Sequence, residues 1–200
     1  LTAIDPAMPV SGAGASNVGI AGSIAVNALD LSSNATLAGG YGVTMLSGGT
    51  GKFALTAENV SASSASSTPA SGAASGSKVG IGASVAVNVV SNRATALMDD
   101  NSTVSGASDI TVQATGKDTV TTTAEAGASG GTAITPVAAI NVINNTVGAR
   151  IGSGATLTAT GDLLVEADQT ASASASAKGS SQGSTAAIGA AVAVALVDDE

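Results

Sequence analysis

The sequence contains no cysteine, no histidine and no tryptophan, and its only aromatic residues are Tyr41 and Phe53. Without histidine and cysteine, the chain cannot assemble a Ser–His or Cys–His nucleophilic pair, and the usual zinc ligands are missing. Disulfides are excluded for the same reason. The phosphate-binding Gly-x-x-x-x-Gly-Lys-Ser/Thr motif is also absent. The composition therefore predicts no catalytic, cofactor-binding or metal site, and no cofactor.

Charge and long hydrophobic runs are scarce as well. Charged residues make up 10% of the chain, and the six Lys and Arg are outnumbered by 14 Asp and Glu, for a net charge of −8. Nucleic-acid binding depends on basic residues that neutralise phosphates, so we expect no nucleic-acid partner. The longest apolar run, residues 186–197, is shorter than the roughly 20 residues that cross a bilayer, so we expect no membrane insertion. The chain starts without Met or a signal peptide, and we expect it to be an internal segment of a secreted protein.

What the chain does contain is a repeat. Four segments rich in Val, Ile, Ala and Gly align: Val18–Asn27, Val79–Asn88, Thr132–Asn141 and Ala186–Val194. The sequence numbers of Asn27 and Asn88 differ by 61, those of Asn88 and Asn141 by 53, and those of Ile134 and Ile188 by 54. Self-similarity at a period of 20–50 residues or slightly more is typical of solenoids and other repeat architectures.

A second block follows each of the first three segments. Asp109–Ala114 matches Asp162–Ala167, and Lys52–Ala57 takes the same place less closely. Each unit then closes with a run of Ser, Thr and Ala that ends in a Gly/Ser-rich turn. The predicted organisation is one continuous solenoid with a lead-in segment (residues 1–16), three repeats (17–77, 78–131 and 132–184) and the start of a fourth (185–200).

The alternation of side chains predicts β-strands. In residues 79–89, larger side chains such as Ile81 and Val85 alternate with small ones such as Gly82 and Ser84. A period of two with many β-branched residues is a strand signal. The small face suits either the close approach of another layer or a flat, weakly hydrated surface.

A single unit of this kind cannot bury its apolar face alone, so we expect units to stack and bury a continuous core. Asn27, Asn88 and Asn141 either form a ladder or simply end strands. One unit makes either one wide coil or two to three coils of about 20 residues. In the second case the chain makes about ten coils, and a rod about 45 Å long at roughly 4.8 Å per coil.

The segment Ala149–Ala167, joined to Val-Ala-Val-Asn strands, resembles the repeats of filamentous-haemagglutinin-like adhesins and of large autotransporter passengers. The resemblance implies a right-handed parallel β-helix, export through the bacterial outer membrane, and a role in adhesion or biofilm. The chain departs from these repeats in having little Phe and Leu. We therefore expect a thin interior packed with Ala and Val.

Carboxylates and threonines are the remaining candidates for binding. Oxygen clusters at Asp99–Asn101 and Asp198–Glu200 are of the kind that calcium prefers. However, Gly152–Gly154 replaces the first cluster in the next repeat, and the calcium-binding nonapeptide is missing, so we interpret Asp99–Asn101 as a solvated turn. Thr119, Thr121 and Thr123 share one face of a strand, as in ice-binding solenoids, but Ser and Ala replace them in the other repeats.

These observations predict an all-β protein: a β-solenoid, most typically a right-handed parallel β-helix, built from imperfect repeats with a period of about 53 to about 61 residues. The predicted function is that of a non-catalytic stalk or filament segment of a large secreted bacterial surface adhesin. The alternatives are a self-assembling extracellular fibre subunit and a carbohydrate- or ice-binding module. Expected partners are the neighbouring repeats, copies of the chain joined end to end or edge to edge, and a host or matrix surface reached through regions outside this sequence.

Overall fold

The computed structural model describes residues 8–10, 14–15, 17–46, 50–69 and 74–200. All regular structure in these residues is β-strand, and they contain no helix. The all-β prediction is confirmed.

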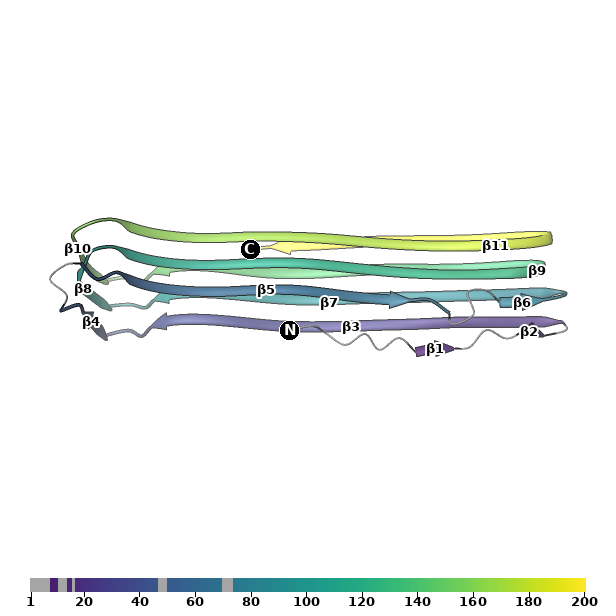
Figure 1. Ribbon diagram of the computed structural model, residues 1–200, viewed down its shortest axis with the longest axis horizontal. Helices are drawn as coiled ribbons and strands as arrows, with labels where there is room; N and C mark the ends of the chain where they lie inside the picture. The colour runs from purple at the N-terminus through teal and green to yellow at the C-terminus, as the bar shows by residue number, and fades with distance from the viewer. Residues whose placement is uncertain (1–7, 11–13, 16, 47–49, 70–73) are drawn as a thin grey trace.

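Five long strands make up most of the molecule (Figure 1). They are β3 (Val18–Leu37), β5 (Phe53–Ser67), β7 (Val79–Met98), β9 (Ile110–Ile151) and β11 (Leu163–Asp199). The short strands are β1 (Met8–Val10), β2 (Gly14–Ala15), β4 (Gly42–Thr44), β6 (Ala74–Gly76), β8 (Thr103–Ala107) and β10 (Thr156–Ala159).

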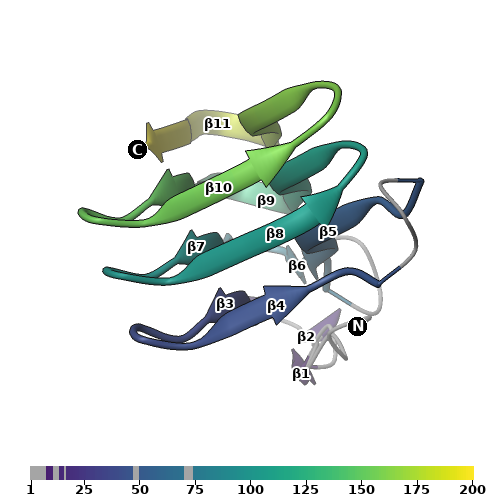
Figure 2. The ribbon, with the colours of Figure 1, turned by 90° about the vertical axis from the view of Figure 1, so that its left-hand side faces the viewer.

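The long strands form two layers. Residues 110–124 of β9 pair with β5, whereas residues 132–151 pair with β7, so β9 contributes one half to each layer. β11 follows β9 in the same way along its whole length. We call β3, β7 and residues 132–151 and 186–199 the β7 layer, and β5 and residues 110–129 and 163–183 the β5 layer. At one end, β4, β8 and β10 form a third, small parallel sheet that connects the two layers (Figure 2).

Neighbouring strands are parallel, except that β1 pairs antiparallel with β3. Val18 pairs with Val79, Val79 with Thr132, and Thr132 with Ala186, so the sequence numbers of paired positions advance by 61, then by 53, then by 54. These steps equal the spacing of the aligned sequence segments. One step takes the chain once along the β7 layer and once back along the β5 layer. The alternative of many short coils stacked into a rod about 45 Å long is therefore wrong.

The small side chains of the alternating pattern point into the molecule. Gly80, Gly82 and Ser84 in β7 are buried, while Val85 and Val89 are exposed on the other side of the strand. A Cβ atom on Gly80 would lie 2.3 Å from the carbonyl oxygen of Ser129, and one on Gly82 would lie 2.2 Å from that of Gly127. The two layers approach so closely here that only small residues fit between them. Our expectation that stacking buries the larger apolar face is wrong, because that face lies outside.

The interior widens toward the small sheet. There, Met98, Val104, Ile110 and Val112 are fully buried, and Phe53 packs against them. Elsewhere the buried apolar residues are mainly Ala, as in the group formed by Ala25, Ala86, Ala124, Ala126, Val137 and Ala139. The expected thin interior packed with Ala and Val is confirmed.

The closing runs of Ser, Thr and Ala form β-strands. Residues 61–67 belong to β5, and residues 119–129 continue β9 without a break. The Gly/Ser-rich composition reflects the close approach of the two layers where the chain passes from the β5 layer to the β7 layer. A Cβ atom on Gly130 would lie 2.4 Å from the carbonyl oxygen of Gly76.

Candidate functional site

The carboxylates of Asp99 and Asp100, which were considered as calcium ligands, accept backbone hydrogen bonds in the turns. The backbone N–H of Asp100 donates to Asp99 Oδ1 at 2.8 Å, and that of Ser153 in the next repeat donates to Asp100 Oδ1 at 2.7 Å. Asn101 adopts a left-handed backbone conformation, with φ of 56°, which Asn tolerates well. These oxygens are thus engaged by backbone donors. Within the described part of the chain, no three Asp or Glu residues come together as a possible metal site.

The second carboxylate group ends β11. Asn145 Nδ2 donates to Asp199 Oδ1 at 2.8 Å, and the backbone N–H of Glu200 donates to the carbonyl of Asn145 at 2.9 Å. Asp198 is exposed on the other side of the strand. The group therefore splits between the two sides of the β7 layer.

The outer side of the β7 layer carries an apolar surface, which we call the apolar face. Ile20, Ile24, Ile188 and Val192 are 55–60% exposed on it. Its members are the outward side chains of residues 18–28, 79–89, 132–142 and 186–196. In register they form the rows Val18/Val79/Thr132/Ala186, Ile20/Ile81/Ile134/Ile188, Gly22/Ala83/Pro136/Ala190, Ile24/Val85/Ala138/Val192, Val26/Val87/Ile140/Val194 and Ala28/Val89/Val142/Leu196. No charged residue interrupts these rows.

The apolar face ends abruptly along each strand. The next outward row is Asp30, Ser91, Asn144 and Asp198, and Arg93 and Arg150 lie farther along. Soluble proteins rarely expose a contiguous apolar patch of this kind unless it binds something. The apolar face is therefore the strongest candidate for a functional surface.

The outer side of the β5 layer has the opposite chemistry. Thr119 and Thr121 are exposed there, and Thr123 is half-buried. Their paired neighbours are Ala62, Ser64 and Ser66 in β5 and Ser172, Ser174 and Ser176 in β11. We call this surface the hydroxyl face. The threonines thus share one side of a strand as predicted, and only β9 presents them in a continuous row.

The asparagines at the repeat spacing form a buried ladder. Asn27, Asn88 and Asn141 pair in register and lie in the middle of their strands, so they do not mark strand ends. Asn27 Nδ2 donates to Ser63 Oγ at 2.7 Å, and Ser63 Oγ donates to Asn88 Oδ1 at 2.8 Å. Asn141 Nδ2 donates to the carbonyl of Ser174 at 2.7 Å. The ladder therefore ties the β7 layer to the β5 layer.

A buried carboxylate sits beside this ladder. Asp118 is 1% exposed, and Asn92 Nδ2 lies 2.9 Å from both of its carboxylate oxygens. Gln169 Nε2 donates to Oδ2 at 3.3 Å, and the hydroxyl of Ser61 donates to Oδ1. Among the residues that the structure describes, no Lys or Arg forms an ion pair with it. Asp118 was not among the residues predicted from the sequence. The sequence does indicate that its side chain points inward, because Asp118 lies an even number of residues from the buried Val112 and Val120 in the same strand.

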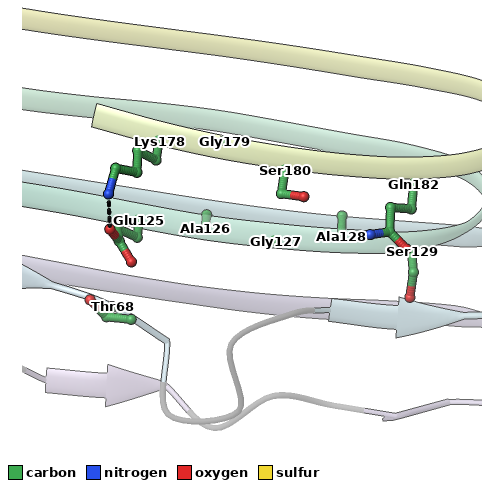
Figure 3. A pocket seen from close by; sticks show the side chains of 10 residues that line it. All are labelled: Thr68, Glu125, Ala126, Gly127, Ala128, Ser129, Lys178, Gly179, Ser180 and Gln182. Carbon is green, nitrogen blue, oxygen red and sulfur yellow. Dashed lines mark hydrogen bonds and ion pairs between the residues drawn. The ribbon is translucent and has the colours of Figure 1, made fainter. Parts of the chain in front are cut away.

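A depression lies over residues 125–129, 178–180 and 182, beside Thr68 (Figure 3). Its volume is about 440 Å³, and its floor is formed by small residues such as Ala126 and Gly127. The charged side chains that line it are Glu125 and Lys178, whose Oε1 and Nζ atoms are 3.1 Å apart. These two side chains therefore form an ion pair that remains largely exposed to solvent.

Asp109 marks the junction of the small sheet with the β5 layer. The backbone N–H of Asp162 donates to its Oδ1 at 3.1 Å, and Lys52 Nζ lies 3.0 Å from its Oδ2. The hydrogen bond from Asp162, followed by the contact with Lys52, lowers the pKa of the Asp109 carboxyl below its usual value of 3.8. These contacts link three successive repeats.

Comparisons with protein families, with curated proteins and with solved structures gave no significant match. In the described residues, no helix is long and apolar enough to span a bilayer. The interpretation of this chain therefore depends on its own geometry.

Proposed function

We propose that this chain is a β-solenoid, wound as a right-handed parallel β-helix, that forms a non-catalytic stalk or filament segment of a large secreted bacterial surface adhesin. The observation that carries the proposal is the register. Strands of successive units pair in parallel over their whole length, with steps equal to the repeat spacing. An array that grows by adding similar steps suits reach and rigidity.

The polar interior supports a structural role. The asparagine ladder and the hydrogen bonds of Ser23 and Ser84 to Ser67 join the two layers at regular intervals. Such bonds resist sliding of one layer over the other, because a shift would leave buried polar groups unsatisfied. A rod that transmits force or displays a distant domain needs this resistance.

Removal of one complete step tests the solenoid. Deletion of residues 79–131 joins Lys78 to Thr132 and places Thr132 opposite Val18. The shortened chain is expected to retain its β-type far-ultraviolet circular dichroism and a cooperative unfolding transition. Deletion of residues 79–98, which removes only β7, serves as the control and is expected to abolish both. Equal loss of structure in the two deletions would contradict the proposal.

The location is tested separately. Antibodies raised against the purified chain are expected to label intact, unpermeabilised bacteria that produce the parent protein. Labelling that appears only after permeabilisation would contradict a surface adhesin, whatever the outcome of the deletion experiment.

A further inference from the structure

The two central rows of the apolar face differ in size. The Gly22 row (Gly22, Ala83, Pro136 and Ala190) consists of small or flat side chains, and the Ile24 row (Ile24, Val85, Ala138 and Val192) consists mainly of β-branched ones. An apolar depression of about 220 Å³ lies here, lined by Ala83, Val85, Pro136, Ala138, Ala190 and Val192 together with Ser84 and Val137. The face thus has a groove along the stacking direction with a ridge beside it.

Groove and ridge compensate each other in every strand. Where the groove residue is Gly22, the ridge residue is Ile24, and Ala190 is matched by Val192. Pro136 is the bulkiest residue of the groove, and in its strand the ridge residue shrinks to Ala138. The combined side-chain volume of the groove and ridge positions therefore varies less from strand to strand than the volume of either position alone. A constant combined volume is what we expect if the ridge of one surface packs into the groove of another.

We propose that the apolar face binds the same face of a second copy of this chain, around a two-fold axis parallel to the stacking direction. Placed between the Gly22 and Ile24 rows, the axis puts the ridge of each copy into the groove of the other. It also pairs the Ile20 row with the Val26 row, and the Val18 row with the Ala28 row. All six rows are then covered, since the axis passes through the middle of the face, and the contact is isologous and closed.

The area is sufficient for a stable dimer. Rows two residues apart are about 6.8 Å from one another, and strands are about 4.8 Å apart, so six rows across four strands cover about 780 Å² per copy. The pair buries about 1,560 Å², which lies within the roughly 1,200–2,000 Å² of specific complexes.

The chemistry of the face fits a second copy better than a lipid surface. Surfaces that lie on membranes combine apolar residues with Lys, Arg and Trp at their borders. The apolar face has no basic or aromatic residue in its rows, and the net charge of −8 opposes binding to anionic lipid. Two copies instead meet through surfaces that are both uncharged.

Sedimentation velocity of the full chain over a concentration series tests the proposal. The wild-type chain is expected to form a closed dimer. Val85→Lys and Val192→Lys, which place a charge on the ridge, are expected to raise the dissociation constant at least tenfold. Thr121→Lys, on the hydroxyl face, is the matched control and leaves it unchanged. Val85→Thr keeps the shape of the side chain and weakens the dimer without threatening the fold, which circular dichroism verifies for each variant.

Cross-linking tests the orientation, since the chain has no natural cysteine. In the proposed dimer Ala83 faces Val85 of the other copy. A short bismaleimide is therefore expected to link a mixture of Ala83→Cys and Val85→Cys chains faster than either chain alone. A monomer at all concentrations, open-ended growth, or binding to neutral lipid vesicles in place of dimerisation would overturn the inference. It does not depend on the proposed adhesin role.

Discussion

Individual glycines set how closely the two layers approach. Gly82 faces the backbone of Gly127, where any side chain would overlap a carbonyl oxygen. Gly148 lies in the same layer, but a Cβ atom there would meet nothing within 4 Å. The two positions therefore separate the steric requirement for glycine from its general effect on the unfolded chain.

Gly82→Ala is expected to lower the free energy of unfolding by about 1–3 kcal/mol, the range for forcing extra atoms into a packed interior. Gly148→Ala is the matched control and is expected to be neutral or to stabilise by about 0.4–1 kcal/mol, because alanine restricts the unfolded chain. Urea denaturation followed by circular dichroism measures both. Equal destabilisation by the two substitutions would argue against a close approach at Gly82.

The buried carboxylate of Asp118 makes a second prediction. Asn92→Leu introduces the side chain that Leu31 supplies at the paired position, and it removes the amide that donates to Asp118. We expect it to destabilise the chain by about 1–3 kcal/mol, the cost of leaving a buried polar group short of partners. Asp118→Ala, which copies the paired Ala171, is expected to restore most of the loss in the double variant. An additive double variant would show that the two residues do not act together.

Asp109 gives a pH-dependent prediction. Its folded pKa is lowered by the hydrogen bond from Asp162 and by Lys52, so ionised Asp109 contributes stability above the unfolded pKa. This contribution is lost as the pH falls through the folded pKa, below about pH 3.9. The wild type is therefore expected to have a higher free energy of unfolding than Asp109→Asn at neutral pH, and this difference is expected to shrink in acid. Lys52→Met is expected to remove only part of it.

At the scale of the strand, differences in length between the first two units are confined to the connections. Between paired positions of the first two units, the sequence numbers differ by 61 at β3 and β4, by 57 at β5 and by 54 at β6. At β7, where the second unit starts to pair with the third, the difference is 53. The extra residues of the first unit thus lie between β4 and β5, between β5 and β6, and just before β7. The long strands β3, β5 and β7 each keep a single register with the next unit, because a slip by one residue would turn every side chain to the opposite side. β11 shifts register against β9 between Gly183 and Ala186, and β10 shifts against β8 between Thr158 and Ala159.

Hydrogen exchange is expected to follow this pairing. β7 is bonded to β3 on one edge and to β9 on the other, whereas β11 pairs with β9 alone. Amides of residues 84–98 are therefore expected to exchange more slowly than those of residues 186–199, as read by mass spectrometry of peptides. Uniform exchange across the two segments would contradict the described stacking.

Sequence alone predicted the strands, their alternation and the equivalence of Asn27, Asn88 and Asn141. It did not predict which side of the strands is buried. Hydrophobicity favours Val and Ile inside, but the distance between the layers is set by close backbone contacts such as that between Gly80 and Ser129, which only the assembled fold creates. The role of Asp118 was missed for the same reason, since its donors come from distant parts of the chain.

For the whole molecule, the two outer surfaces follow from the same alternation. Where the layers approach so closely that only small residues fit between them, as at Gly82 and Gly127, each strand has a single side left for larger ones. The β7 layer uses that side for Ile and Val, and the β5 layer for Ser and Thr. The molecule is therefore a thin plate with one apolar and one hydrogen-bonding surface.

The confinement of the length differences between the first two units to the connections also indicates where such a plate tolerates new sequence. The junctions between β4 and β5 and between β5 and β6 already hold more residues in one unit than in the next, while the strands on either side keep their partners. A peptide grafted at either junction would lie outside the strand pairing and leave the stack undisturbed. Units with lengthened junctions would thus carry recognition loops at regular intervals, with neighbouring loops separated by one strand-to-strand distance.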